Sequence, residues 1–389
     1  MSKAVVFGAG NIGRGFLGIL LHQSGYRVTF VDVDARRVEE INKYREYPVF
    51  SCSEAGTKEQ VVSRVRAIRF DDTNAVAMAV RDADLVLTAV GKRALELAAQ
   101  PIAEGLTARI KYNPDSVTHI AVIACENVRD NTEYLAKFIL DSVPDDMKSK
   151  VRSAVSFPNC LVDRIVPNVA ADLGHPLAVM VEEYYQIAID GGQLVGHFPE
   201  VKGLEIVPSV SAKLDQKLFT LNMAHGVVGY WGSVRGHQYV HEAVADATVL
   251  ALVEGSFAEV EEVLVQLHPT ITHEAQQKFA SDVLKRFRNH YLKDELRRVA
   301  SAPKRKLAGN ERLVKPASLL WEQGKIPAFL SSGIASGLIY RNKNDLQALE
   351  IENEIAERGI DVVITEVAGL PRSHPVAHII RADYLLRSL

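Results

Sequence analysis

A glycine-rich turn near the start of the chain constrains the fold more than any other feature. Residues 8–13 read Gly-Ala-Gly-Asn-Ile-Gly, a GxGxxG pattern. The apolar run that precedes them, at 3–7, is typical of a buried parallel strand, and helix-forming residues follow through Leu21. A second strand-like run at 27–31 ends in Asp32. This order of strand, glycines, helix, strand and acid predicts a dinucleotide-binding βαβ unit.

The three glycines have different physical roles in such a unit. Gly8 permits the tight turn, Gly10 lets the backbone approach a pyrophosphate, and Gly13 lets helix and strand pack closely. The N–H groups at the helix N-terminus then face the phosphates. An ordinary strand–turn–helix, with glycines that serve packing alone, is the alternative. The predicted cofactor contacts in this loop are Gly8, Ala9, Gly10, Asn11, Ile12 and Gly13.

Asp32 indicates which dinucleotide binds. Its carboxylate lies about 20 residues beyond the motif, where it can accept hydrogen bonds from the adenosine ribose. The same charge repels a 2′-phosphate, so NAD is favoured over NADP. Arg36 and Arg37 follow closely and would soften that preference.

Two further apolar runs, at 84–91 and 119–125, extend the predicted sheet. In open parallel sheets, ligands bind beyond the carboxyl ends of the strands. The residues at those ends are therefore candidates for the nicotinamide side of the site, with plain loop residues as the alternative. They are Ala89, Val90, Gly91, Glu126 and Asn127.

Charge and cysteine content exclude several classes of protein. The formal net charge is -3, which does not favour nucleic acid or an anionic membrane as a partner. The three cysteines form no CxxC pair, so no disulfide framework or cysteine zinc site is indicated, and free thiols suit the cytoplasm. The sequence shows no signal peptide and no apolar stretch of about 20 residues. We therefore expect a cytoplasmic protein, a monomer or small homo-oligomer, without a metal.

The middle of the chain carries the candidate catalytic groups. Asn159 lies in the run 155–167, where its amide can donate to a substrate oxygen, whereas the neighbouring Asp163-Arg164 pair is interpreted as a structural ion pair. The later sequence Lys-x4-Asn-x2-His comprises Lys217, Asn222 and His225. At 100° per residue, an α-helix places these three on one broad face. Apolar neighbours can desolvate a lysine amine and make it a general base, although Lys213 is a rival and a solvated surface lysine is the ordinary alternative.

The Lys-x4-Asn-x2-His spacing resembles the catalytic signature of the polyol-specific long-chain dehydrogenases. The Val-Asp-Arg-Ile-Val-Pro run at 162–167 resembles the family's other hallmark, and the spacing of Arg286, Asn289, Asp294, Arg298 and Lys306 also agrees. The resemblance implies that Lys217 is the base, that Asn159 and Asn222 donate to the oxyanion, and that His225 orients the substrate or Lys217. It also implies that Arg298 and Lys306 contact the polyol chain.

The substrate expected from this resemblance is phosphorylated. Free-mannitol members tend to read Glu-Pro-Phe-x-Gln-Trp where this chain reads Glu-Glu-Tyr-Tyr-Gln-Ile at 182–187, and 389 residues suit the shorter, phosphate-specific members. The expected reaction is NAD-dependent oxidation of D-mannitol 1-phosphate to D-fructose 6-phosphate. Residues 285–306 hold nine lysines or arginines against two acids, enough for a phosphate site, although most belong to a solvated helix face. The predicted ligands are Arg298 and Lys306, followed by Lys304 and Arg305.

The fold class predicted is α/β, a Rossmann-type doubly wound sheet at 1–198 followed by a mainly helical substrate domain at 199–389. Apolar residues at helical spacing around 240–267, 273–300, 346–358 and 376–388 carry the second assignment. Zinc-dependent and short-chain dehydrogenases do not fit, because the cysteines are scattered and none of the 12 tyrosines has a lysine four positions later. A sister enzyme for an unphosphorylated polyol or hexuronate, and a non-catalytic NAD-binding sensor, stay open.

Overall fold

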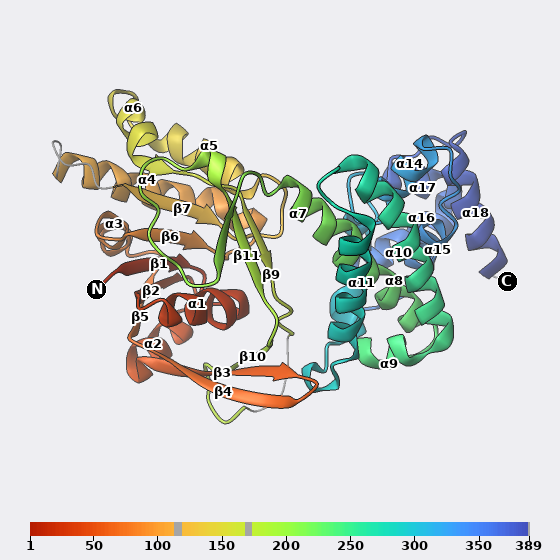
Figure 1. Cartoon of the computed structure of the whole chain (residues 1–389), viewed down its shortest axis with the longest axis horizontal. Coiled ribbons are helices and arrows are strands. Elements are labelled where there is room, and N and C mark those ends of the chain that lie inside the picture. Colours follow the sequence, from red (N-terminus) through yellow and green to blue (C-terminus); the bar gives the residue numbers. More distant parts are fainter. Residues whose placement is uncertain (113–118, 168–172, 388–389) are drawn as a thin grey trace. The chain divides into compact units, whose positions relative to one another are not determined.

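The computed structural model describes residues 1–112, 119–167 and 173–387. Its internal contacts divide the chain into two units (Figure 1). The first contains Met1–Val166 and continues to Ser211, and it is built around a parallel sheet. The second begins at Ala212 and is helical.

The main sheet of the first unit has six parallel strands in the order β5-β2-β1-β6-β7-β8. This is the classic order of the dinucleotide-binding fold, in which the strand order reverses between β1 and β6. The strands predicted at 3–7, 27–31, 84–91 and 119–125 are present as β1, β2, β6 and β7. The six strands are β1 Lys3–Phe7, β2 Arg27–Asp32, β5 Val65–Arg69, β6 Leu85–Thr88, β7 Ile120–Ala124 and β8 Val155–Ser156.

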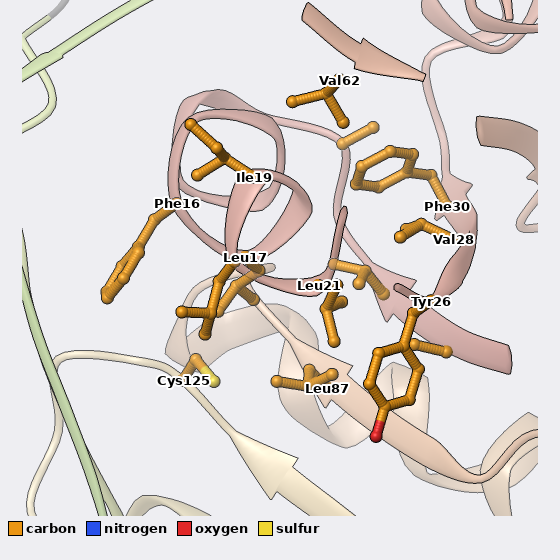
Figure 2. Packing of buried hydrophobic residues seen from close by; sticks show 14 of the residues in the cluster. Phe16, Leu17, Ile19, Leu21, Tyr26, Val28, Phe30, Val62, Leu87 and Cys125 are labelled. Atoms are coloured by element: carbon orange, nitrogen blue, oxygen red, sulfur yellow. The ribbon is translucent and has the colours of Figure 1, made fainter. Parts of the chain in front are cut away.

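Both faces of this sheet are buried, as the apolar runs require. Ala4 and Val6 of β1 face one hydrophobic cluster, and the alternate residues Val5 and Phe7 face the other. The first cluster is covered by η1 (Gly13–Gly18), α1 (Ile19–Gln23) and α2 (Ala35–Tyr44). Figure 2 shows Leu17 of η1 beside Leu87 and Cys125 of the sheet. The second cluster lies under α3 Thr73–Arg81, α4 Lys92–Tyr112, α5 Asn131–Ser142 and α6 Asp145–Ala154.

Two small sheets complete the first unit. One has the order β10-β3-β4, and the other has the order β12-β11-β9. β12 pairs in parallel with β11, which keeps residues 204–207 with the first unit and puts the division at Ser211, beyond the expected boundary at 198. The strands are β3 Glu46–Ser53, β4 Gly56–Ser63, β9 Cys160–Asp163, β10 Val179–Glu182, β11 Gln186–Asp190 and β12 Leu204–Val207.

The second unit is organised around α8 (Met223–Val234). This helix packs against α9 (Val240–Ala245), α10 (Ala247–Leu267), α12 (Leu296–Ala300) and α15 (Ala328–Ile339). Its glycines permit close approach: a Cβ on Gly229 would lie 3.0 Å from the backbone nitrogen of Ala300, and one on Gly232 would lie 2.7 Å from the Cβ of Ala243. α12 is thereby held close to the middle of α8. The helices expected at 240–267 and 273–300 are each interrupted, the first at Asp246 and the second by a loop at 289–295.

The remaining elements of the second unit are helices. They are α7 Ser211–Gln216, η3 Lys217–Asn222, α9 Val240–Ala245, α10 Ala247–Leu267, α11 His273–Arg288, η4 His290–Leu292, α12 Leu296–Ala300, α13 Pro303–Lys306, α14 Val314–Glu322, α15 Ala328–Ile339, α16 Leu346–Arg358, α17 Ile360–Ala368 and α18 Pro375–Arg387. None of the helices in the described part of the chain is both long and apolar enough to cross a membrane.

Candidate active site

The glycine loop leaves open space at one position and none at the other two. Gly8 has φ +94°, and a Cβ there would crowd the backbone of Ala89 at the end of β6. A Cβ on Gly13 would collide with the carbonyl oxygen of Gly8. A Cβ on Gly10 would meet nothing within 4 Å. Packing therefore requires Gly8 and Gly13, whereas the absence of a side chain at Gly10 fits the approach of a ligand.

Asp32 closes this loop and carries the expected acid at the end of β2. Its carboxylate accepts hydrogen bonds from the backbone N–H groups of Ala9, at 2.6 Å, and Asp34, at 2.9 Å. The Arg37 guanidinium donates to both carboxylate oxygens, at 3.2 and 3.3 Å. Arg37 therefore bears on cofactor choice, because its guanidinium pairs with the carboxylate that is predicted to contact the ribose.

Glu126 joins the ends of β6 and β7. One carboxylate oxygen accepts from the Thr88 hydroxyl at 2.8 Å and the other from the Val90 N–H at 2.9 Å. Burial raises the pKa of this carboxyl group, and these hydrogen bonds oppose the rise. Glu126 thus fixes the loop that continues into Gly91, while Asn127 beside it is exposed. Ala89 and Val90 are half-buried, so the loop presents mostly backbone to its surroundings.

Asn159 is oriented by the N-terminus of α5. Its side-chain oxygen accepts from the backbone N–H groups of Thr132, at 3.2 Å, and Glu133, at 3.1 Å. Because the amide oxygen is held there, the amide NH2 points away from the helix end and is the half of the side chain left for a ligand. The backbone N–H of Asn159 donates to Gln193 at 2.6 Å, which fixes the loop from the other side.

Arg164, next to this segment, has a structural role, but its partners are aromatic rings and backbone carbonyl oxygens and not the predicted Asp163. Its guanidinium carbon lies 5.8 Å from the ring centroid of Phe16 and 5.6 Å from that of Tyr185. The guanidinium group donates to the carbonyl oxygens of Glu182 and Gly15, at 2.9 and 3.1 Å. These contacts tie η1 to β10.

In the second unit, Lys217 and Asn222 are the first and last residues of η3, a π-helical turn. The backbone N–H of Met223 donates to the carbonyl of Leu218, the i→i+5 bond of that geometry. This differs from the α-helix expected from the sequence, in which five residues advance about 1.4 turns. In a π-turn they advance roughly one turn, so Lys217 and Asn222 lie more nearly above one another. Single π-turns inside helices are frequent at functional sites.

His225 lies in the first turn of α8 and is buried. Its ring packs on Phe287, with centroids 4.4 Å apart. Among the described residues, no hydrogen-bond partner reaches its Nε2 atom, and the nearer carboxylate oxygen of Asp294 is 4.0 Å away. Burial, then the charges of Arg298 and Arg286, holds the pKa of His225 well below its usual range. The ring is therefore neutral at pH 7, with a buried polar atom that a ligand can satisfy.

A group of cations surrounds this histidine. Arg298 forms a bidentate pair with Asp294, both contacts being 2.5 Å. Lys306 is 5% exposed and donates to the carbonyl oxygen of Val299 at 2.6 Å. Arg298 and Lys306, the two ligands predicted from the sequence, therefore belong to one cluster of side chains. Whether they hold a substrate stays a prediction.

The two less certain phosphate ligands face other groups. Lys304 pairs with Glu354 at 2.7 Å and Glu350 at 3.0 Å, both on α16. Arg305 is about half exposed and lies 3.7 Å from Glu311. To bind a phosphate, Lys304 would have to exchange these two carboxylate partners for it.

Sequence reasoning missed two buried arginines of the cluster. Arg286 on α11 was noted for its spacing alone, and Arg312 falls outside the basic run 285–306. Both lie close enough to lower the pKa of His225. The neighbours of Arg312, Asn310 and Glu311 before it and Lys315 after Val314, are polar, so the local sequence gave no signal of its burial. Within the described residues, no group of three His, Cys, Asp or Glu side chains is placed to hold a metal.

Two family models match successive parts of the chain. The mannitol dehydrogenase Rossmann domain matches residues 2–203, and the mannitol dehydrogenase C-terminal domain matches residues 210–381. The chain belongs to the mannitol dehydrogenase family. The resemblance inferred from the sequence is thereby confirmed, and the first unit is the Rossmann domain of an oxidoreductase.

Curated relatives within this mannitol dehydrogenase family match nearly full length. A mannitol-1-phosphate 5-dehydrogenase of Thermoanaerobacter pseudethanolicus is 38% identical over 99% of this chain and 97% of the relative. One of Clostridium acetobutylicum is 36% identical over 98% of each. Among solved structures, mannitol 2-dehydrogenase of Pseudomonas fluorescens, in a ternary complex with NAD and D-mannitol, has a TM-score of 0.78 at 16% identity, covering 99% of this chain and 92% of that one. At that identity it supports the fold alone, and it confirms the predicted class, a Rossmann-type sheet followed by a helical domain.

Proposed function

We propose that this protein catalyses the reversible, NAD-dependent oxidation of D-mannitol 1-phosphate to D-fructose 6-phosphate. The observation that carries the proposal is the second unit's buried cationic cluster around the unsatisfied Nε2 atom of His225, three residues after Asn222. A cluster of arginine and lysine side chains suits a phosphorylated substrate. Full-length relatives with the name mannitol-1-phosphate 5-dehydrogenase support the same substrate.

The cofactor is NAD, bound on the first unit. Gly10 leaves room for the pyrophosphate, and the backbone N–H groups after it face the phosphates. The Asp32 carboxylate accepts hydrogen bonds from the ribose hydroxyls, and its negative charge disfavours a 2′-phosphate. When bound, the nicotinamide supplies the acceptor for the two electrons that leave the reacting carbon.

The proton that leaves the reacting hydroxyl goes to Lys217. As a general base it must start neutral and end as an ammonium group, so the chemistry needs no metal in this scheme. The NH2 groups of Asn159 and Asn222 donate to the substrate oxygen as negative charge develops on it. Asn159 is suited to this by its fixed side-chain oxygen, which leaves only the donor half available. Neutral His225 then orients the polyol through Nε2.

Arg298 and Lys306 are the proposed contacts of the phosphorylated chain. Asp294 presets the plane of the Arg298 guanidinium with two hydrogen bonds. A preset planar fork binds a phosphate with less loss of side-chain entropy than a free arginine does. Lys306 adds a donor whose environment is dominated by other positive charges.

The deciding experiment follows NADH oxidation with fructose 6-phosphate and fructose side by side, with and without a metal chelator. Reduction of the phosphorylated sugar alone, unaffected by chelation, supports the proposal. Equal or faster reduction of fructose refutes the phosphate site while leaving the family chemistry intact. If neither sugar is reduced, the proposed substrate is refuted. Hexuronate substrates, or a non-catalytic NAD-binding role, are then the next hypotheses.

The role of Lys217 is tested by substitution. Lys217→Ala should lower kcat by a factor of roughly 10² to 10⁴, the usual contribution of a general base, while the Kd for NADH stays unchanged. Lys213→Ala, one helical turn earlier on α7, is the matched control and should keep kcat. Comparable losses in both variants, or none in Lys217→Ala, would contradict the assignment.

A further inference from the structure

Arg312 is a buried arginine that touches the catalytic turn. It is 5% exposed and lies just before α14. Its Nε and Nη2 atoms both donate to one oxygen of Glu311, each at 3.2 Å. Its Nη1 atom makes a long hydrogen bond, 3.5 Å, to the backbone carbonyl of Asn222, where the π-turn passes into α8. Arg312 thus links the end of η3 to Glu311, and its charge acts on Lys306 and His225.

We propose that Arg312 is a positioning residue of this site, which holds the Asn222 end of the π-turn and keeps the buried amine of Lys306 without its proton until an anionic substrate arrives. The substrate part of this inference rests on the proposed function. The part that concerns the charge of Lys306 does not.

The surroundings of Lys306 favour a neutral amine. Its Nζ donates to the Val299 carbonyl at 2.6 Å and makes two longer contacts, to the Arg298 carbonyl at 3.4 Å and the Ser301 hydroxyl at 3.5 Å. Among the described residues, no carboxylate oxygen lies within ion-pair distance, 4.0 Å, of this atom. A buried ammonium group without a carboxylate partner is costly, and that cost favours loss of its proton.

Three arginines and one acid are the charged groups that act on Lys306. Arg298 comes from α12, Arg305 from α13 and Arg312 from the loop before α14, while Asp345, before α16, is the acid that opposes them. Burial first, and then the charge of Arg312, lowers the pKa of Lys306 to about 6. Arg312 ranks ahead of Arg305 and Arg298 among these charges, so its removal should have the largest effect.

A phosphate beside Lys306 reverses this balance. Two negative charges favour the ammonium form, so substrate binding near neutral pH should take up a proton at Lys306. An uncharged polyol offers no such compensation. The proton-poor amine therefore favours phosphorylated over free substrates, because only the former convert Lys306 into a charged ligand.

Three variants separate charge from structure. Glu311→Gln breaks the ion pair of Arg312 but leaves its positive charge. Arg312→Lys keeps the charge on a different side chain. The double variant Arg312→Met with Glu311→Gln removes both charges at similar volume, so that no buried carboxylate is left unpaired.

Proton uptake is measured by calorimetric titration of fructose 6-phosphate into the NAD-saturated protein, at pH 7.5, in two buffers of different ionisation enthalpy. Wild type should take up more protons than Lys306→Met, which lacks the amine. Glu311→Gln should match wild type, and the double variant should take up fewer protons. Its kcat should fall about tenfold, with partial recovery in Arg312→Lys. Unchanged proton uptake and unchanged kcat in the double variant would overturn the inference.

A second measurement needs no substrate. Because the folded state lowers the pKa of Lys306 to about 6, the unfolded chain binds a proton there that the folded chain does not, between about pH 6 and 10. Wild type should therefore lose stability as pH falls from 10 to 7, by up to about tenfold in the unfolding constant per pH unit, relative to Lys306→Met. The double variant should lose less. If it loses as much as wild type, the charge inference fails; if it loses less but fructose 6-phosphate does not bind wild type, only the proposed function fails.

Discussion

The glycine loop allows a paired test that separates cofactor binding from folding. Gly10→Ala and Gly13→Ala add the same methyl group three residues apart. At Gly10 the new carbon meets nothing within 4 Å, whereas at Gly13 it falls well inside 3.0 Å of the Gly8 carbonyl oxygen, closer than real Cβ atoms come. The two variants should therefore fail for different reasons.

The expected magnitudes follow from what each methyl group meets. At Gly13 the colliding atom is backbone, in a residue held at φ +94°, so the helix or the turn must shift. Overpacking of this kind costs about 1–3 kcal/mol, or roughly 3–10 °C in the Tm of a domain of this size. At Gly10 the stability of the ligand-free protein should change by less than about 0.5 kcal/mol. The Kd for NADH should nevertheless rise at least about tenfold, because the methyl group occupies the space that the pyrophosphate needs.

The assay is a thermal melt of each variant with and without NADH, combined with a fluorescence titration of NADH. Wild type should gain Tm on adding the cofactor, Gly10→Ala should start from the wild-type Tm and gain little, and Gly13→Ala should start lower. If Gly10→Ala binds NADH within twofold of wild type, the space beside Gly10 is not the pyrophosphate site.

Substitutions at three further positions test other parts of the two units. Asp32→Ala should raise the Kd for NADH about ten- to hundredfold and reduce the discrimination against NADPH, because Arg37 loses the carboxylate it pairs with at 3.2 Å; competitive titration of both cofactors checks this. Asn159→Asp should keep the cap on α5 and the wild-type Tm but lose turnover, whereas Asn159→Ala should lose both; a retained kcat in Asn159→Asp contradicts the donor role. Asp294→Asn should raise KM for fructose 6-phosphate more than it lowers kcat, since the guanidinium of Arg298 loses its bidentate partner, and steady-state kinetics give the split.

The parallel sheet could be predicted because its signals are local. The runs at 3–7 and 27–31 are apolar on both faces, and the glycine turn between them is characteristic of a dinucleotide-binding βαβ unit. The two small sheets gave no comparable signal. β4 reads Gly-Thr-Lys-Glu-Gln-Val-Val-Ser and has little buried surface, and β12 is a four-residue strand whose partner, β11, lies 17 residues away in the pairing of Ile187 with Leu204. Because β12 is specified by a partner that is not adjacent in sequence, the expected domain boundary fell before it.

The candidate site was predictable in residue type and less so in geometry. Lys217, Asn222 and His225 stood out by spacing, but the spacing was read as an α-helix, and the chain forms a π-turn there. An i→i+5 turn costs a regular hydrogen bond and is stabilised by tertiary contacts, which no local propensity reports. Likewise, Lys304 and Lys306 are equivalent in sequence, two residues apart on α13, yet one pairs with carboxylates of α16 and the other is buried against carbonyl oxygens.

The contrast between these two lysines indicates what the cationic cluster is built for. Several lysines and arginines of the 285–306 run pair with nearby acids at the surface, as Lys285 does with Asp282 and Arg297 with Glu295. Lys306 instead lies in a field of like charge, an arrangement that lowers stability and that folding alone does not require. Destabilising charge placement of this kind is characteristic of binding sites, where a ligand of opposite charge restores the balance. The unsatisfied nitrogen of His225 in the same cluster is a second cost of the same type, and a phosphorylated polyol would relieve both.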